Sequence, residues 1–180
     1  MTPGTVVLLH SPHGAADGWG DLPEMLRSYG LDVIAPDVPD AAGPRYVARA
    51  SLVIAATDPS VPLVLVGHGA AGPLLPAVAL AQRAAHRGVG GYVFVDADLP
   101  RPRRGHEHDH EEGHGEPPAP VPADWPDAPC GYLWTHADRT AGSAERERSV
   151  REARLRGWTV VEHEPPAAAA QSLSELIATL

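Results

Sequence analysis

The chain has 180 residues, of which 43% are hydrophobic, so it can bury the core of one domain. Its formal net charge is −9, and this acidic balance argues against a nucleic-acid partner or an acidic membrane partner. Cys130 is the single cysteine, which excludes an intramolecular disulfide, and the N-terminal apolar run is too short for a signal peptide or membrane helix, so we expect a cytoplasmic protein.

Short apolar runs alternate with longer alanine-rich and leucine-rich segments along the whole chain. Most runs are apolar throughout, which is typical of strands that helices cover on both faces. This alternation predicts a single α/β domain over 1–180, a three-layer sandwich around a mostly parallel sheet of about six strands. In chain order we expect a strand at 5–10, a helix at 19–29, a strand at 32–37, a helix at 44–57, a strand at 62–67, a helix at 70–87, strands at 91–97 and 131–136, a helix at 143–156, a strand at 159–164 and a helix at 170–180.

The first and fourth of these helices differ in the side chains they present. The first carries large side chains at helical spacing, which predicts a buried face formed by Trp19, Leu22, Leu26 and Tyr29. The fourth is highly charged, and the spacing of Glu145, Arg148 and Glu152 favours ion pairs one turn apart on a solvated face.

Residues 101–129 interrupt this alternation of strands and helices, because the segment is rich in Pro, Gly, His and acidic residues. We expect a long, mobile surface loop between the fourth and fifth strands, His/Pro-rich over 101–123. Its run "HEHDHEEGH" could bind Zn²⁺, Ni²⁺ or Cu²⁺ loosely through His106, His108, His110 and His114. It lacks the fixed spacing of a structural zinc site, so a solvated loop is the favoured interpretation.

Polar side chains follow nearly every predicted strand. They are His10, Ser11, His13, Asp37, His68, Asp96, Asp98, His136, Asp138 and His163. Because ligands of open parallel sheets bind beyond the carboxyl ends of the strands, these residues predict a site at one edge of the sheet.

Five segments in order resemble the α/β-hydrolase family. "VVLLHSPHGAADGWGDLPEMLRSYGLDVIAPDVPD" is similar to the opening strand, oxyanion loop, helix and second strand, and "PLVLVGHGAAGPLLP" to the nucleophile elbow. "GYVFVDADLP", "DAPCGYLWTHAD" and "RGWTVVEHE" resemble the later strands. The resemblance covers nearly the whole chain except 101–123. It implies the α/β-hydrolase fold in a shortened form that lacks the two strands that usually open the family's sheet and lacks a helical lid.

The chain departs from the family's pattern at three places. Gly69 stands where the family has its nucleophilic serine, so covalent chemistry through that position is excluded. Pro12 stands where an oxyanion-loop N–H would donate, and proline has none. His163 arrives several residues before the family's histidine loop, whereas Asp96, Asp98 or Asp138 could be the acid. A missing side chain at Gly69 would also leave space for a substrate against the N–H of Ala70.

Each candidate residue has a structural interpretation beside the catalytic one. His68 could be catalytic or could pack structurally in the turn, and Ser11 could replace the nucleophile or cap the next turn. His10 could transfer protons or could be a hydrogen-bonded structural histidine. His136 and Asp138 could form an oriented general base or a polar loop edge. The candidate catalytic set is His10, His68, Asp96, His136, Asp138 and His163. The candidate substrate pocket is Ser11, Pro12, His13, Trp19, Gly69, Ala70 and Asp98.

The elbow also meets the pattern G-x-G-x-x-G at Gly67, Gly69 and Gly72, between a strand and a helix. No acidic residue ends a strand about twenty residues later, as dinucleotide binding requires, so we expect no cofactor.

Three functions remain open at this point. The first is a non-hydrolytic enzyme that moves protons in a cyclisation, elimination, dehydration or isomerisation of a small apolar intermediate, as in secondary metabolism such as antibiotic biosynthesis. The second is a pseudo-hydrolase that binds a small-molecule ligand or a partner protein without turnover. The third is hydrolysis by a replacement nucleophile or an activated water. An incompletely protected sheet edge makes a homodimer a further expectation.

Overall fold

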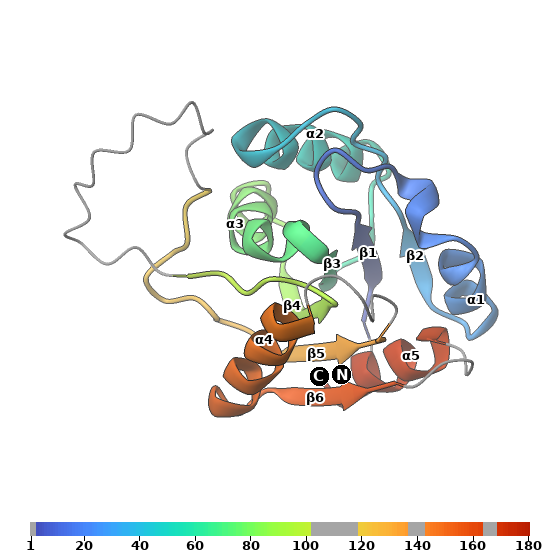
Figure 1. The fold of residues 1–180 in the computed structure, drawn as a ribbon. Helices are drawn as coiled ribbons and strands as arrows, with labels where there is room; N and C mark the ends of the chain where they lie inside the picture. Colours follow the sequence, from blue (N-terminus) through green and yellow to red (C-terminus); the bar gives the residue numbers. More distant parts are fainter. Residues whose placement is uncertain (1–2, 102–118, 137–142, 164–168) are drawn as a thin grey trace, which may run out of the picture.

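The computed structural model describes residues 3–101, 119–136, 143–163 and 169–180. Its centre is a six-stranded, fully parallel sheet with the order β2-β1-β3-β4-β5-β6 (Figure 1). The strands are β1 Thr5–Leu9, β2 Asp32–Ile34, β3 Leu63–His68, β4 Val89–Val95, β5 Cys130–Trp134 and β6 Thr159–Glu162. The predicted parallel α/β sheet is therefore confirmed, with somewhat shorter strands than the apolar runs suggested.

Helices cover both faces of this sheet, as expected for strands that are apolar throughout. They are α1 Leu22–Ser28, α2 Gly43–Ala56, α3 Leu75–Ala84, α4 Ser143–Leu155 and α5 Ala169–Thr179, with the short 3₁₀ helices η1 Ala16–Trp19 and η2 Gly69–Leu74. Helices α1 and α5 lie on one face, and α2, α3 and α4 lie on the other (Figure 1).

Strand β1, which pairs with β2 on one side and β3 on the other, has residues in the cores on both faces of the sheet. All five of its residues are buried, and successive side chains point to opposite faces. Val6 and Leu8 pack in the core beneath α1 and α5, whereas Val7 and Leu9 pack beneath α2, α3 and α4. A run without polar alternation is thus buried on both faces at once.

The first helical segment is not the single helix predicted over 19–29. It divides into η1 and α1 around Gly20, which has φ +53°, a conformation that favours glycine. Trp19 and Leu26 are buried as predicted, but Tyr29 is 47% exposed. Tyr29 lies beyond the last residue of α1, where the chain already turns toward Gly30 with φ +87°, so it does not share the helix's buried face.

The helix predicted over 70–87 begins as the 3₁₀ helix η2 before it becomes α3. Pro73 lies inside η2 and donates no backbone hydrogen bond there. Among the described residues, no helix lies as a lid over the carboxyl ends of the strands. None of the helices described is both long and apolar enough to span a bilayer.

Candidate functional site

The turn after β3 carries the feature that defines the site. Gly69 follows the last residue of β3 and has φ +56°, so the chain makes the sharp strand-to-helix turn on which α/β-hydrolases carry their nucleophile. A Cβ atom added at Gly69 would lie 2.3 Å from the Oγ of Ser11. The side chain of Ser11 therefore already fills the volume beside Gly69, and the prediction that glycine leaves this volume open to a substrate is wrong.

Ser11 is held in this position by the backbone of the turn itself. Its hydroxyl donates a hydrogen bond to the carbonyl oxygen of His68 at 2.9 Å. The Oγ also lies 3.4 Å from Nδ1 of His68, at the outer limit of a hydrogen bond. The ring of His68 meets the indole of Trp19 edge to face, with centroids 5.6 Å apart. Four candidates thus meet here: Ser11, Trp19, His68 and Gly69.

His10 is held in a different environment from Ser11, although it is the adjacent residue. Its side chain lies in the core, with 3% of the residue exposed. Nε2 accepts a hydrogen bond from the N–H of Val38 at 3.0 Å, and Nδ1 donates to the carbonyl oxygen of Ser11 at 2.8 Å. An N–H can only donate and a carbonyl can only accept, so both ring nitrogens are occupied, Nε2 as an acceptor and Nδ1 as a donor.

Tyr46 of α2 completes the surroundings of His10. Its hydroxyl donates to the carbonyl oxygen of His10 at 2.6 Å, and the two rings pack edge to face. Burial raises the pKa of the Tyr46 hydroxyl well above its ordinary value of 10.0. His10 therefore ties the end of β1 to the loop after β2 and to α2.

The loop after Ser11 carries two further candidates, Pro12 and His13. His13 is exposed and has φ +62°, and the N–H of Gly14 donates to the carbonyl oxygen of Ser11 at 2.9 Å. Pro12 has no N–H to offer an oxyanion, and Ala70 is exposed at the start of η2.

The two aspartates after β4 are bound to neighbouring groups. Asp96 has φ +45°, and its carboxylate accepts bonds from the N–H of Thr135 at 2.8 Å and from the Thr135 hydroxyl. Asp98 forms an ion pair with Arg146 of α4 at 2.7 Å, and its N–H donates to the carbonyl oxygen of Gly69 at 3.1 Å. Asp96 therefore joins the ends of β4 and β5, and Asp98 joins the elbow to α4.

The candidate histidines after β5 and β6 contact side chains of β5, β6 and α5. His136 stacks on Trp134 with centroids 3.7 Å apart, and its Nε2 lies 3.8 Å from an oxygen of Glu162. Nδ1 of His163 lies 2.9 Å from the Oγ of Ser172 in α5. Asp138 and the loop histidines His106, His108, His110 and His114 lie outside the described residues.

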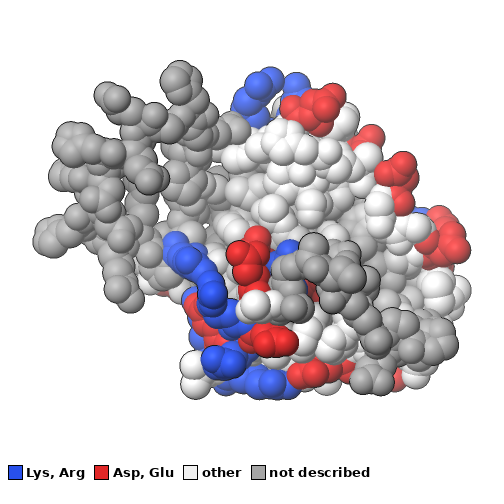
Figure 2. All heavy atoms as spheres, in the orientation of Figure 1, with Lys and Arg blue, Asp and Glu red and all other residues white. Residues whose placement is uncertain are grey.

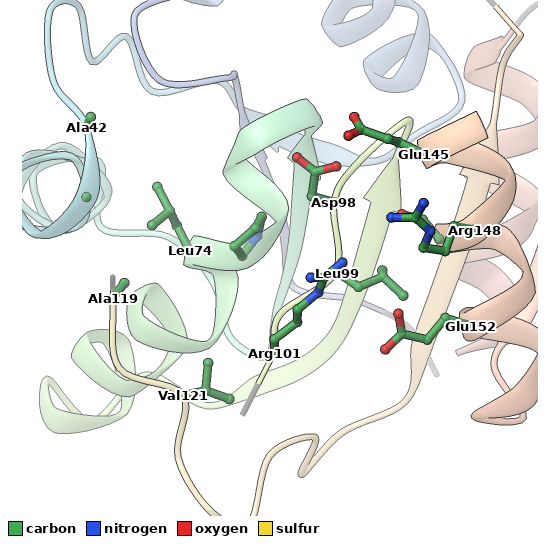
Figure 3. Close-up of a pocket in the computed structure, with 13 residues that line it drawn as sticks. Ala42, Leu74, Asp98, Leu99, Arg101, Ala119, Val121, Glu145, Arg148 and Glu152 are labelled. Carbon is green, nitrogen blue, oxygen red and sulfur yellow. The ribbon is translucent and has the colours of Figure 1, made fainter. Parts of the chain in front are cut away.

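A pocket of about 560 Å³ opens beside the elbow rather than at it (Figure 3). It lies between the start of α2, η2, α4 and the chain on either side of the segment 102–118. Its lining is Ala42, Gly43, Pro73, Leu74, Asp98, Leu99, Arg101, Ala119, Val121, Glu145, Arg148, Ser149 and Glu152. Asp98 is the one lining residue that the sequence analysis placed in a site.

The sequence analysis missed this pocket because it interpreted α4 as a solvated helix. The spacing of Glu145, Arg148 and Glu152 on one side of α4 was the available signal, since these residues share a face at helical period. That face lines the pocket. The ion pairs of α4 also differ from the expected ones, because Arg146 binds Asp98, Arg154 binds Glu162, and Arg156 binds Glu152.

The glycine pattern at the elbow has a cause in packing. A Cβ at Gly67 would lie 3.0 Å from the side chain of Leu75, and one at Gly72 would lie 2.1 Å from the carbonyl oxygen of Asp98. Close packing of protein atoms therefore accounts for the absence of a side chain at both positions. Within the described ranges, no three His, Cys, Asp or Glu side chains are grouped to hold a metal ion.

No family model and no curated protein sequence matches the chain, but solved structures do. A pyrethroid hydrolase from Sphingobium faniae JZ-2 is 16% identical with a TM-score of 0.62, over 98% of this chain and 96% of that one. An extracellular α/β-hydrolase from a Paenibacillus species is 15% identical with a TM-score of 0.64, over 98% of both chains. A variant of tomato methylketone synthase I complexed with beta-ketoheptanoate is 14% identical with a TM-score of 0.60, over 99% and 98%.

These likenesses extend over whole chains and agree with the topology of the sheet. The protein has the α/β-hydrolase fold. The neighbours include both hydrolases and a methylketone synthase, so the fold by itself does not define the reaction.

Proposed function

We propose that this protein is a pseudo-hydrolase, an α/β-hydrolase-fold protein that binds a small molecule in the pocket beside α4 and forms no covalent intermediate at its elbow. One observation carries the proposal: Gly69 has no side chain, and the Oγ of Ser11 lies 2.3 Å from where its Cβ would be. The volume that a nucleophile needs is taken by a hydroxyl whose own proton is donated to the carbonyl oxygen of His68.

The positions of the other candidate catalytic groups support the same conclusion. Both nitrogens of His10 are engaged, and the carboxylate of Asp96 is engaged by Thr135. A pocket of about 560 Å³ falls within the usual size range of small-molecule sites, roughly 300–1,000 Å³. The chain thus has room for a ligand and few groups ready to react with one.

A second candidate is hydrolysis with Ser11 as a replacement nucleophile. The observation that favours it is the 3.4 Å separation between Ser11 Oγ and His68 Nδ1, because a histidine at this distance could accept the serine proton after a small movement. Ala70 is an exposed residue at the start of η2, and its N–H would be the donor to a developing oxyanion.

Proton-transfer chemistry, such as cyclisation, elimination or isomerisation, is the remaining alternative. Its best-placed pair is His136 and Glu162, whose Nε2 and Oε2 atoms lie 3.8 Å apart. Glu162 also binds Arg154, so its carboxylate is shared between two cations when His136 is protonated. We therefore regard proton-transfer chemistry as less well supported than ligand binding without turnover.

Labelling with a fluorophosphonate, followed by intact-mass analysis, separates the first two candidates. We expect no covalent adduct on the wild-type protein and no hydrolysis of p-nitrophenyl butyrate above the rate of the buffer. An adduct that Ser11→Ala abolishes would overturn the pseudo-hydrolase proposal and establish Ser11 as the nucleophile.

The variant Ser11→Ala/Gly69→Ser tests whether Ser11 Oγ and a side chain at position 69 compete for the same volume. With Ser11 truncated to Ala, the nearest remaining side-chain atom is its Cβ, 3.7 Å from the new Cβ, an ordinary van der Waals contact. We expect Gly69→Ser alone to be destabilised by the clash with Ser11 Oγ, and the double variant to recover part of that loss. Gly157→Ala is the matched control, because Gly157 has φ +74° and no atom within 4 Å of an added Cβ.

A further inference from the structure

The carboxylates of the pocket are mostly neutralised by arginines that do not line it. Asp98 pairs with Arg146, and Glu152 pairs with Arg156. Arg156 is itself fixed, because its guanidinium lies 5.2 Å from the ring centroid of Trp158 and donates to the carbonyl oxygen of Pro100. These two carboxylates therefore have little negative charge to offer a ligand.

The two arginines that do line the pocket are in the opposite situation. Arg101 and Arg148 form no ion pair with any acid in the described part of the chain. Figure 3 shows both guanidinium groups directed toward the same space, Arg101 from the chain after β4 and Arg148 from α4. Glu145 is the one remaining pocket carboxylate without an arginine partner among the described residues. Counted together with their partners Arg146 and Arg156, the described charged groups of the pocket carry four positive and three negative charges, an excess of one positive charge.

Apart from Ser149 of α4, the rest of the lining is apolar and comes from other segments of the chain. Leu74 and Pro73 come from η2, Leu99 from the chain after β4, and Val121 from the chain before β5. Arginine side chains gather at the α4 side of the molecule, next to acidic side chains, as Figure 2 shows. The pocket therefore combines a side that carries charges of both signs with an apolar side.

We infer that this pocket binds an amphipathic monoanion, a carboxylate with an apolar body, with the carboxylate between Arg101 and Arg148 and the body against Leu74, Leu99 and Val121. The inference rests on the proposed ligand-binding function and names the class of ligand for it. Guanidinium groups bind carboxylates through paired, charge-assisted hydrogen bonds. A single excess positive charge favours a monoanion over a phosphate dianion, since Glu145 would repel the second charge.

Displacement of Nile red, a neutral apolar dye, by two ligands of equal shape tests the inference on the full chain. Sodium octanoate carries the carboxylate, and octanamide replaces it with a neutral amide. We expect octanoate to displace the dye at a concentration about tenfold lower than octanamide does. Raising the salt concentration should reduce this ratio, because the guanidinium groups are partly open to solvent.

Variants of α4 localise the preference. Arg148→Gln should remove most of the octanoate advantage and leave octanamide unchanged, whereas Arg151→Gln is the matched control, an exposed arginine of the same helix that does not line the pocket. Glu145→Gln should strengthen octanoate by about twofold to fivefold, because it removes the unpaired negative charge. Equal displacement by both ligands, displacement by neither, or the same octanoate advantage in Arg148→Gln would overturn the inference.

A separate variant distinguishes failure of the ligand class from failure of the binding function. Val121→Trp places an indole in the pocket, and we expect it to abolish dye binding while the circular dichroism spectrum and Tm stay close to wild type. Dye binding that Val121→Trp blocks, without a preference for octanoate, leaves the pocket as a site and rejects the anionic ligand. Dye binding that survives Val121→Trp rejects the pocket itself.

Discussion

At the scale of single residues, His10 and Ser11 show how adjacent candidates acquire different roles. The sequence predicted both at the carboxyl end of β1, and the structure places them there. His10 turns into the core and bonds through both ring nitrogens, whereas Ser11 turns toward His68 and Gly69. The role of each follows from its hydrogen-bond partners and could not be read from its residue type.

His10→Ala is expected to lower the free energy of unfolding by about 1–3 kcal/mol, because the buried N–H of Val38 loses its acceptor. Urea denaturation followed by circular dichroism measures this loss. His13→Ala is the matched control from the same loop, and its exposed side chain predicts a change within about 0.5 kcal/mol. Equal stability of the two variants would contradict a structural role for His10 and return it to the catalytic candidates.

The filling of the elbow by Ser11 could not be predicted from the sequence. The sequence pattern predicted a sharp turn at Gly69 and the strand ends beside it, because parallel strands bring their carboxyl ends to one edge of the sheet. The distance of 2.3 Å between Ser11 Oγ and a Cβ at Gly69 depends on how closely the loops after β1 and β3 approach. Distances of this kind arise from packing and leave no trace in residue spacing.

At the scale of elements, η2 shows where sequence patterns predict a helix but not its form. The alanine-rich and leucine-rich segment 70–87 predicted one continuous helix, and α3 occupies Leu75–Ala84 of it. The residues before Leu75 form the 3₁₀ helix η2, which passes against the chain after β4, where the N–H of Asp98 donates to the carbonyl oxygen of Gly69. This contact joins segments about thirty residues apart, so no local propensity encodes it.

Gly72→Ala tests the close approach of η2 to the chain after β4. A Cβ at Gly72 would lie 2.1 Å from the carbonyl oxygen of Asp98 and 3.0 Å from the Cβ of Ala97, so one backbone segment must move. We expect the free energy of unfolding to fall by about 1–3 kcal/mol. We also expect weaker ligand binding in the pocket, because Asp98 lines it.

Gly18→Ala is the control for that substitution, since nothing lies within 4 Å of its added Cβ. Its stability should be unchanged or slightly higher, because alanine lowers the entropy of the unfolded chain. Thermal denaturation of both variants compares them directly. A Gly72→Ala protein as stable as Gly18→Ala would show that η2 is free to move away from Asp98.

At the scale of the whole molecule, the layers were predictable and the pocket was not. Continuous apolar runs separated by helical segments define a parallel sheet covered on both faces, whichever residues fill the loops. The pocket is formed by α2, η2, α4 and two segments of the chain between β4 and β5. These five pieces lie at 42–43, 73–74, 98–101, 119–121 and 145–152, so they are separated in sequence. The net charge that they present depends on the ion pairs of α4, which the sequence does not specify.

The core on the α2, α3 and α4 side also contains groups that should make the molecule sensitive to alkaline pH. Tyr46, Tyr92, Tyr132 and Cys130 all belong to this core. Burial raises the pKa of the Cys130 thiol from 9.0 to about 12 and raises the pKa values of the three tyrosines well above 10.0. The chain contains no lysine, so few other side chains titrate between pH 9 and 12.

Because these pKa values are raised in the folded state, the folded protein holds protons that the unfolded chain releases. Their contribution to stability is complete below about pH 9 and is lost as the pH rises through the ordinary values and toward the raised ones. Above about pH 10, each buried group should lower the free energy of unfolding by about 1.4 kcal/mol per pH unit.

Urea denaturation between pH 8 and pH 11.5 measures this slope. Tyrosinate absorbance at 295 nm, followed in the same samples, should rise for the buried tyrosines together with the loss of helical signal. Tyr132→Phe should reduce the slope by the contribution of one group, about 1.4 kcal/mol per pH unit, although it also loses the bond to the carbonyl oxygen of Ala97. Tyr29→Phe removes the hydroxyl of an exposed residue and should leave the slope unchanged. A tyrosinate signal that rises fully while the helices remain intact would show that this core admits hydroxide without unfolding, and would contradict a closed layer beneath α2, α3 and α4.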